Sequence, residues 1–71
     1  MRNTKKWVGV GIVARRDSGG YMVYYPAVVR LNGEVLPFRD GYTYEDLARG
    51  VAQSEARWAE VPYLGYVREG K

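Results

Sequence analysis

The stretch Thr43–Trp58, TYEDLARGVAQSEARW, decides the fold, because it is the one candidate helix in a chain whose other segments have strand and turn patterns. Apolar residues recur along it at steps of three, four and seven, which predicts an amphipathic helix with a single apolar stripe. The stripe consists of Tyr44, Leu47, Ala48, Val51, Ala52, Trp58 and Ala59. We therefore expect the rest of the chain to pack against this stripe.

Local signals place the ends of this helix. The hydroxyl of Thr43 is suited to be the N-cap, because it can accept from a backbone N–H that has no partner in the first turn. Pro62 prevents the helix from continuing. Gly50, in the interior, costs about 1 kcal/mol of helix stability relative to alanine. We expect it to allow close approach to the protein's own sheet; close approach to a partner is the alternative.

The segment Trp7–Arg15 alternates in the way that is typical of a strand. One face carries Val8, Val10, Ile12 and Ala14. The other face includes Gly9 and Gly11, whose missing side chains leave a channel in which a helix or another backbone can come close. The compact turn Asp17–Gly20 then predicts a hairpin with the next strand.

Three further strands are predicted, at Tyr21–Leu31, Glu34–Phe38 and Tyr63–Arg68. Asn32-Gly33 favours a tight hairpin turn between the first two of these. Pro26 indicates a bulge, a bend or an edge position, and Pro37 and Arg39 fit an edge strand that is guarded against further pairing.

The order β-β-β-α-β predicts an α+β fold: an antiparallel sheet of about four strands with one helix packed on one face. The 71 residues suffice for a single domain, 1–71, with a flexible basic lead-in at 1–6 and a polar tail at 69–71.

The composition excludes several kinds of site. The chain contains neither cysteine nor histidine, so disulfides, ordinary zinc sites, and catalysis by a cysteine or a histidine-activated serine are not available. We expect a chain that is not an enzyme and needs no cofactor. We see neither a signal peptide nor a segment long enough to cross a membrane, so we expect a monomer in the cytoplasm that makes no membrane contact.

Charge is unevenly distributed along the chain. Residues 1–39 carry a net charge of +5 and residues 40–71 a net charge of −2. A basic half suits an acidic partner, either a nucleic acid or an acidic protein surface.

The candidate binding residues combine cations with aromatic anchors. They are Lys5, Lys6, Trp7, Arg15, Arg16, Arg30, Arg39, Tyr66 and Arg68. In one hypothesis the cations contact phosphates and Trp7 stacks on bases. In the other, which we adopt, the chain is a small protein-binding inhibitor whose arginines pair with acidic side chains and whose aromatic residues, Tyr63 included, anchor the contact.

The chain resembles small bacteriophage proteins that inhibit host RNA polymerase. The similar features are Lys5-Lys6-Trp7 at the start of a strand, Thr43–Leu47 at the start of the helix, and Pro62 before a last strand that ends in Val67-Arg68. The resemblance implies an inhibitor whose partner is the acidic surface of a bacterial RNA polymerase, contacted by Arg68.

A second resemblance is to the N-terminal domain of HicB-type antitoxins. Asp17, Gly19-Gly20-Tyr21, Val23 and Tyr25-Pro26 are similar to that family's hairpin, and Thr43, Glu45 and Leu47 are similar to its helix start. This resemblance implies an antitoxin that neutralises an RNase toxin. Both resemblances imply that the chain blocks another macromolecule by binding it.

Overall fold

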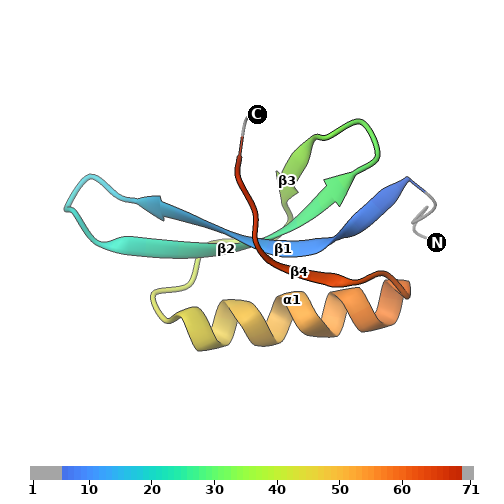
Figure 1. Cartoon of the computed structure of the whole chain (residues 1–71). Helices are drawn as coiled ribbons and strands as arrows, with labels where there is room; N and C mark the ends of the chain where they lie inside the picture. The colour runs from blue at the N-terminus through green and yellow to red at the C-terminus, as the bar shows by residue number, and fades with distance from the viewer. Residues whose placement is uncertain (1–5, 70–71) are drawn as a thin grey trace.

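The structure, a computed structural model, describes residues 6–69. Within these residues the chain forms one sheet and one helix (Figure 1). The elements, in chain order, are β1 (Trp7–Arg16), β2 (Met22–Arg30), β3 (Val35–Pro37), α1 (Glu45–Ala59) and β4 (Tyr63–Tyr66). The predicted α+β fold and the order β-β-β-α-β are therefore confirmed. The predicted lead-in and the end of the tail lie outside the described residues, except for Lys6 and Glu69.

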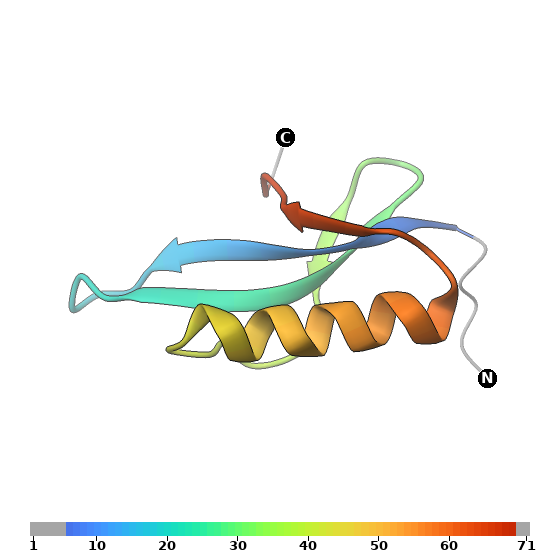
Figure 2. The same ribbon diagram turned by 60° about the horizontal axis from the view of Figure 1, so that its bottom comes forward.

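The sheet is mixed, so the prediction of a wholly antiparallel sheet is wrong at one strand. Its strand order is β3-β2-β1-β4. β1 pairs with β2, and β2 with β3, in antiparallel fashion, whereas β4 runs parallel to β1. The reason is the path of α1, which carries the chain back to the end of the sheet where β1 begins (Figure 2).

Alanines make the contact between helix and sheet. Ala48, Ala52 and Ala56 are buried and recur every four residues, so they lie on one face of α1. This face packs against Val10 and Ile12 of β1. Small side chains let the helix lie close to the sheet, and a larger residue at these positions would hold it away.

The predicted apolar stripe is correct in its alanines Ala48 and Ala52 but wrong in its larger members. Tyr44, Leu47 and Trp58 are exposed by 69%, 54% and 57%. Leu47 and Trp58 lie on a flank of α1 rather than on the face that contacts β1, and Tyr44 precedes the helix. Periodicity does not separate these two surfaces, because both the flank and the buried face carry apolar residues at helical spacing.

Two expectations about the helix are also corrected. The N-cap is Tyr44, which makes no capping hydrogen bond through its side chain, and the helix starts at Glu45 rather than at Thr43. Gly50 is exposed, and a Cβ atom built on it would meet nothing within 4 Å. It therefore does not serve close approach to the protein's own sheet.

The two glycines of β1 do serve a close approach. A Cβ atom on Gly9 would lie 2.7 Å from the carbonyl oxygen of Pro62, and one on Gly11 would lie 2.6 Å from that of Gly65. Side chains therefore cannot be added at either position without moving β4. The predicted channel is confirmed, and the backbone that occupies it is that of β4.

A β-bulge between Trp7 and Gly9 changes which way the start of β1 faces. Trp7 packs against the core on the helix side of the sheet, while Val8 is 41% exposed. The prediction that Val8 shares the inner face with Val10 and Ile12 is therefore wrong, because the extra residue of a bulge interrupts the alternation of a strand.

Pro26 lies in the central strand β2 and not at an edge. It pairs with Ile12 of β1, and its carbonyl oxygen accepts a hydrogen bond from the N–H of Phe38 at 3.1 Å. The backbone nitrogen of Pro26 is on the β3 side of β2. β3 ends at Pro37, which pairs with Ala27, so Pro26 lies just beyond the last pair of the β2–β3 ladder. A proline is tolerated there because no ladder donor is needed.

Candidate functional site

The predicted binding residues separate into two groups at opposite ends of the sheet. Lys6, Trp7 and Arg30 line one hollow beside β3, and Arg39 comes two residues after the end of β3. Arg15 and Arg16 end β1 at the hairpin, and Tyr66 and Arg68 line a separate hollow with residues of β1. Lys5 lies outside the described residues.

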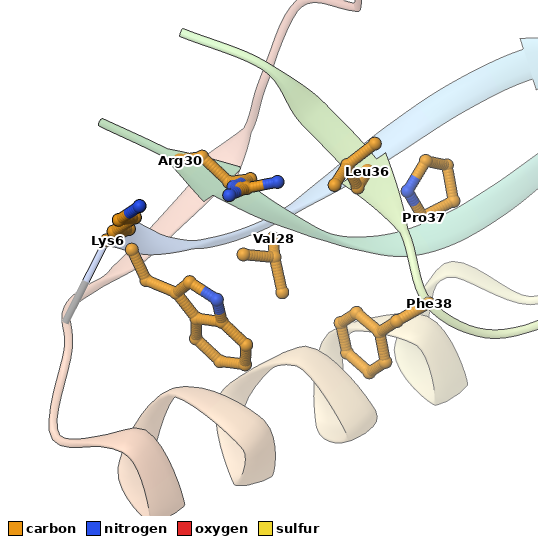
Figure 3. Close-up of a pocket in the computed structure, with 7 residues that line it drawn as sticks. Lys6, Val28, Arg30, Leu36, Pro37 and Phe38 are labelled. Carbon is orange, nitrogen blue, oxygen red and sulfur yellow. The ribbon is translucent and has the colours of Figure 1, made fainter. Parts of the chain in front are cut away.

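The hollow beside β3 is apolar with a basic rim. Its volume is about 430 Å³. The lining residues are Lys6, Trp7, Val28, Arg30, Leu36, Pro37 and Phe38. Phe38 points toward α1 from the end of β3, and Lys6 and Arg30 lie at the opposite end of the hollow (Figure 3). Large apolar side chains are thus accessible beside two cations.

The hollow exists because α1 does not extend beneath β3. The helix packs mainly against β1, β2 and β4, while β3 and its turn project away from it (Figure 1). Trp7 and Phe38, which are half-buried against the core, line the hollow that is left beside the β2–β3 hairpin.

Two neighbouring hollows extend this surface to the helix. One, lined by Pro37–Asp40, shares Pro37 and Phe38 with the first. The other has a volume of about 540 Å³ and shares Arg39 with the hollow lined by Pro37–Asp40. Besides Arg39, the residues that line this last hollow are Asp46, Leu47, Gly50, Val51, Ser54 and Glu55 of α1. We call the three together the β3-side groove.

Cations flank the groove on the sheet side. Arg30 forms an ion pair with Glu34 at 3.5 Å between the nitrogen and the carboxylate oxygen, and both side chains are exposed. Lys6 and Arg39 have no ion pair among residues 6–69. An exposed pair such as Arg30–Glu34 is weak, so an acidic partner can replace Glu34 at little cost.

The arginines at the far end are engaged within the chain. Both guanidinium nitrogens of Arg15 that face Glu69 donate to its carboxylate, one of them at 2.8 Å, and Arg15 also lies 4.8 Å over the ring of Tyr25. The Arg15 guanidinium lowers the pKa of Glu69. Arg16 donates to the carbonyl oxygen of Gly20 at 2.8 Å. These contacts fasten the C-terminal segment and the hairpin.

Tyr66 belongs to a cluster that the sequence did not reveal. Its hydroxyl donates to Glu45 at 2.7 Å, and Arg49 donates to the same carboxylate. Arg49 first, and Tyr66 second, lower the pKa of Glu45, while the bond to Glu45 raises the pKa of Tyr66 to about 12. The cluster joins β4 to the start of α1. Glu45 and Arg49 are four residues apart on the helix, but Tyr66 is 21 residues from Glu45, beyond the reach of local patterns.

Arg68 lies outside the last strand. β4 ends at Tyr66, two residues earlier than the predicted strand, and Arg68 is exposed. The N–H of Val67 still donates to the carbonyl oxygen of Ile12 at 2.9 Å, so the segment continues to follow β1. Arg68 is therefore available to solvent, but on the segment after the strand.

Sequence reasoning missed the groove residues Leu36, Phe38 and Leu47, whereas close approach of a partner to Gly50 was its stated alternative. A local signal was present in Leu36-Pro37-Phe38, an apolar run on a strand already identified as an edge. An edge strand has a neighbour on one side only, so its apolar residues have fewer core partners. No local pattern shows which strands the helix covers.

Comparison of the chain with protein-family models, with curated proteins and with solved structures found no match. Among residues 6–69, no three acidic side chains gather in a way that would hold a metal ion. No helix in this part of the chain has the length and apolar character required to cross a membrane.

Proposed function

We propose that this chain is a non-enzymatic inhibitor that binds an acidic surface of a bacterial macromolecular machine. The leading target is host RNA polymerase, by the resemblance to bacteriophage inhibitors. The observation that carries the proposal is the β3-side groove, in which half-buried Trp7 and Phe38 lie between exposed cations. Aromatic residues and arginine are the types that contribute most to protein interfaces.

The bacteriophage resemblance implicates Arg68, yet the groove lies at the other end of the sheet. We therefore assign the main contact to Lys6, Trp7 and Arg39, and leave Arg68 a secondary role. Net charge supports an acidic partner, because the chain carries +3 overall. Such a charge accelerates encounter with an acidic surface.

An antitoxin is the second candidate, because the hairpin that carries the HicB resemblance is well defined. The carboxylate of Asp17 accepts hydrogen bonds from the N–H groups of Gly19 and Tyr21, both at 2.9 Å. Gly20 has a φ of 89°, which favours glycine. These residues explain a hairpin rather than a contact with a toxin, so this candidate ranks below the first.

Affinity capture from bacterial lysate tests the proposal. The tagged chain is incubated with lysate with and without nuclease, and bound proteins are identified by mass spectrometry. We expect a stoichiometric protein that survives nuclease treatment. RNA polymerase would support the first candidate and an RNase the second. Recovery of nucleoproteins that disappear with nuclease would contradict both and favour nucleic-acid binding.

A matched pair of variants shows which end of the sheet is used. Lys6→Glu with Arg39→Glu reverses charge at the groove, and Arg16→Glu with Arg68→Glu reverses it at the far end. Both double variants lower the net charge by the same amount, so a purely long-range effect would weaken binding equally. We expect the groove variant to lose the partner and the far-end variant to retain it. The opposite result would move the contact to the hairpin end.

A further inference from the structure

The hollow beside β3 differs from the two hollows that adjoin it in the charge of its walls. Lys6 and Arg30 are its ionisable lining residues, and none of the described residues that line it carries a carboxylate. Asp40 lines one of the adjoining hollows, and Asp46 and Glu55 line the other. A ligand small enough to be confined to the hollow beside β3 therefore meets cations without meeting these acidic residues.

Strand pairing places the walls of this hollow on one face of the sheet. Trp7 pairs with Arg30, so these two side chains share a face, and Val28 pairs with Leu36 in the same way. Val28 and Arg30 are two residues apart on β2, and side chains at that spacing point to the same face. Phe38 follows Leu36 at the same spacing. This is the helix side of the sheet, because Trp7 and Phe38 pack against the core there.

Charged and apolar side chains are separated along the hollow. Lys6 and Arg30 lie at one end and Phe38 at the other, with Val28 and Leu36 between them (Figure 3). A ligand that fills the hollow along its length would therefore place one end against cations and the rest against apolar side chains. This arrangement suits an anion with an apolar body.

Backbone hydrogen bonds hold the two cationic residues at their end of the hollow. The N–H of Leu31 donates to the carbonyl oxygen of Lys6 at 2.7 Å, and the N–H of Arg30 donates to that of Glu34 at 2.9 Å. The guanidinium of Arg30 lies 3.5 Å from the carboxylate of Glu34, and both side chains are exposed. Charge-assisted hydrogen bonds are ordinarily shorter than this, so the carboxylate of a ligand can bind Arg30 in closer geometry than Glu34 does.

The residues that precede Lys6 are not a suitable occupant. They are Met1–Lys5, and they include Arg2 and Lys5 but no acidic residue. Lys6 and Arg30 would repel these like charges. Because this segment is joined to Lys6, it adds positive charge near the cationic end of the hollow, which favours an anion further.

We propose that the hollow beside β3 is a binding site for a small aromatic carboxylate. The carboxylate would accept hydrogen bonds from Lys6 and Arg30, and the ring would pack on Trp7, Val28 and Phe38. The volume of about 430 Å³ lies within the range of small-molecule sites. An aromatic body is favoured because aromatic pairs gain from their geometry as well as from the apolar area that they bury. The inference goes beyond the proposed function and does not depend on it.

Titration of the purified whole chain with three probes tests this inference. The probes are naphthoate, its neutral amide naphthamide, and inorganic phosphate, all at the same ionic strength. NMR spectra give both the affinity and the location of binding. The indole N–H of Trp7 reports on the hollow, and the backbone N–H groups of the turn Asp17–Gly20 report on the other end of the sheet. No partner protein is present, so the outcome is independent of the proposed function.

We expect naphthoate to bind saturably with a Kd of about 1 mM or below, as is usual for a ligand of its size. It should bind about fivefold more tightly than naphthamide, because hydrogen bonds to a charged group are the stronger ones. Signals of Trp7, Val28 and Leu36 should shift while those of the turn do not, and phosphate, which has no apolar body, should not reproduce these shifts.

Four results would each overturn the inference. They are equal affinity for naphthoate and naphthamide, shifts centred on the turn, the same shifts with phosphate at equal concentration, and no saturable binding of naphthoate up to about 10 mM. All four are measured on the wild-type chain, so the test does not require that any variant folds.

A matched pair of variants tests the role of Arg30. Arg30→Gln removes a positive charge at the hollow, and Arg16→Gln removes one at the hairpin end of the sheet. Both side chains lie outside the core, so both variants are expected to fold, and their NMR spectra check this. Arg30→Gln should weaken naphthoate about threefold and leave naphthamide unchanged, whereas Arg16→Gln should change neither. Equal weakening of naphthoate in the two variants, or no weakening in Arg30→Gln, would contradict direct binding of the carboxylate by Arg30 and overturn the site.

Discussion

Glycines show how one residue type serves opposite purposes in this chain. At Gly9 and Gly11 a side chain would collide with carbonyl oxygens of the segment that contains β4, so these glycines allow two backbones to lie close together. At Gly50 the surrounding space is open, and the fold gains nothing from the missing side chain. The first two glycines are required by the structure, whereas the third is not.

Alanine substitution should therefore have opposite effects at these positions. Gly50→Ala should raise the free energy of unfolding by about 0.5–1 kcal/mol, because alanine favours the helix and meets no obstacle. Gly11→Ala should lower it, because its Cβ would lie 2.6 Å from the carbonyl oxygen of Gly65. Urea denaturation measures both. A loss of stability in Gly50→Ala would show that its helix environment is not the open one described.

The carboxylate of Glu45 provides a prediction about pH. Its pKa is lowered from 4.5, first by Arg49 and then by Tyr66. A lowered pKa in the folded state stabilises the fold at pH values above 4.5, and this contribution is lost as the pH falls through the folded pKa.

We expect Arg49→Gln to raise the pKa of Glu45 more than Tyr66→Phe does, because Arg49 has the larger influence. Carboxyl carbon NMR titration of the three proteins measures these values directly. Glu69, whose pKa is lowered by Arg15, is the internal control and should not change. An unchanged Glu45 pKa in both variants would mean that the cluster does not form in solution.

At the scale of elements, α1 has two apolar surfaces with different roles. The alanine face packs against β1, whereas Leu47 and Trp58, on the flank, are more than half exposed. Hydrophobic periodicity alone cannot separate them, because both contribute apolar residues at helical spacing. The face that packs closely on the sheet is the one with small side chains.

This division predicts contrasting effects of side-chain size. Ala52→Leu should destabilise the protein by about 1–3 kcal/mol, because there is no room for added methylenes between α1 and β1. Leu47→Ala should change stability by no more than about 0.5 kcal/mol, since its side chain is mostly exposed. Thermal and urea unfolding of the two variants provide the comparison. A large loss in Leu47→Ala, with tolerance of Ala52→Leu, would reverse the assignment of the two surfaces.

Sequence patterns could predict those elements whose signals are local. Asn32-Gly33 and Asp17–Gly20 mark turns through their own backbone preferences, and the helix shows its period within its own length. The parallel pairing of β4 with β1 depends on the path of the whole chain, so no local signal contained it. The β-bulge between Trp7 and Gly9 likewise turns Val8 away from the face of Val10 and Ile12, and no local sequence pattern indicates it.

The candidate site was predicted less completely than the fold. Lys6, Trp7, Arg30 and Arg39 were identified from residue type. The structure brings the first three to one hollow and places Arg39 in the hollows that adjoin it. Arg15 and Arg16 were chosen for the same reason, yet their guanidiniums bond within the chain. Charge alone does not show whether a cationic side chain is available to a partner or already bonded within the chain.

At the scale of the whole molecule, the single helix of the described residues covers the sheet unevenly, and this determines where a binding surface can form. The helix packs mainly against three of the four strands, and a hollow remains beside the fourth, β3. The groove that results combines apolar side chains with Lys6, Arg30 and Arg39 on the sheet side and with Asp46 and Glu55 on the helix side. A net charge of +3 favours an acidic partner at long range. Binding at this end is the central claim of our account.

Site-specific photo-crosslinking in bacterial cells tests that claim most directly. A photoreactive phenylalanine is placed at Leu36 or Leu47 in the groove, or at Tyr21, which is 73% exposed at the hairpin end. We predict one protein adduct that is shared by the two groove positions and is not formed from Tyr21. An adduct formed only from Tyr21, or none from either groove position, would contradict the account.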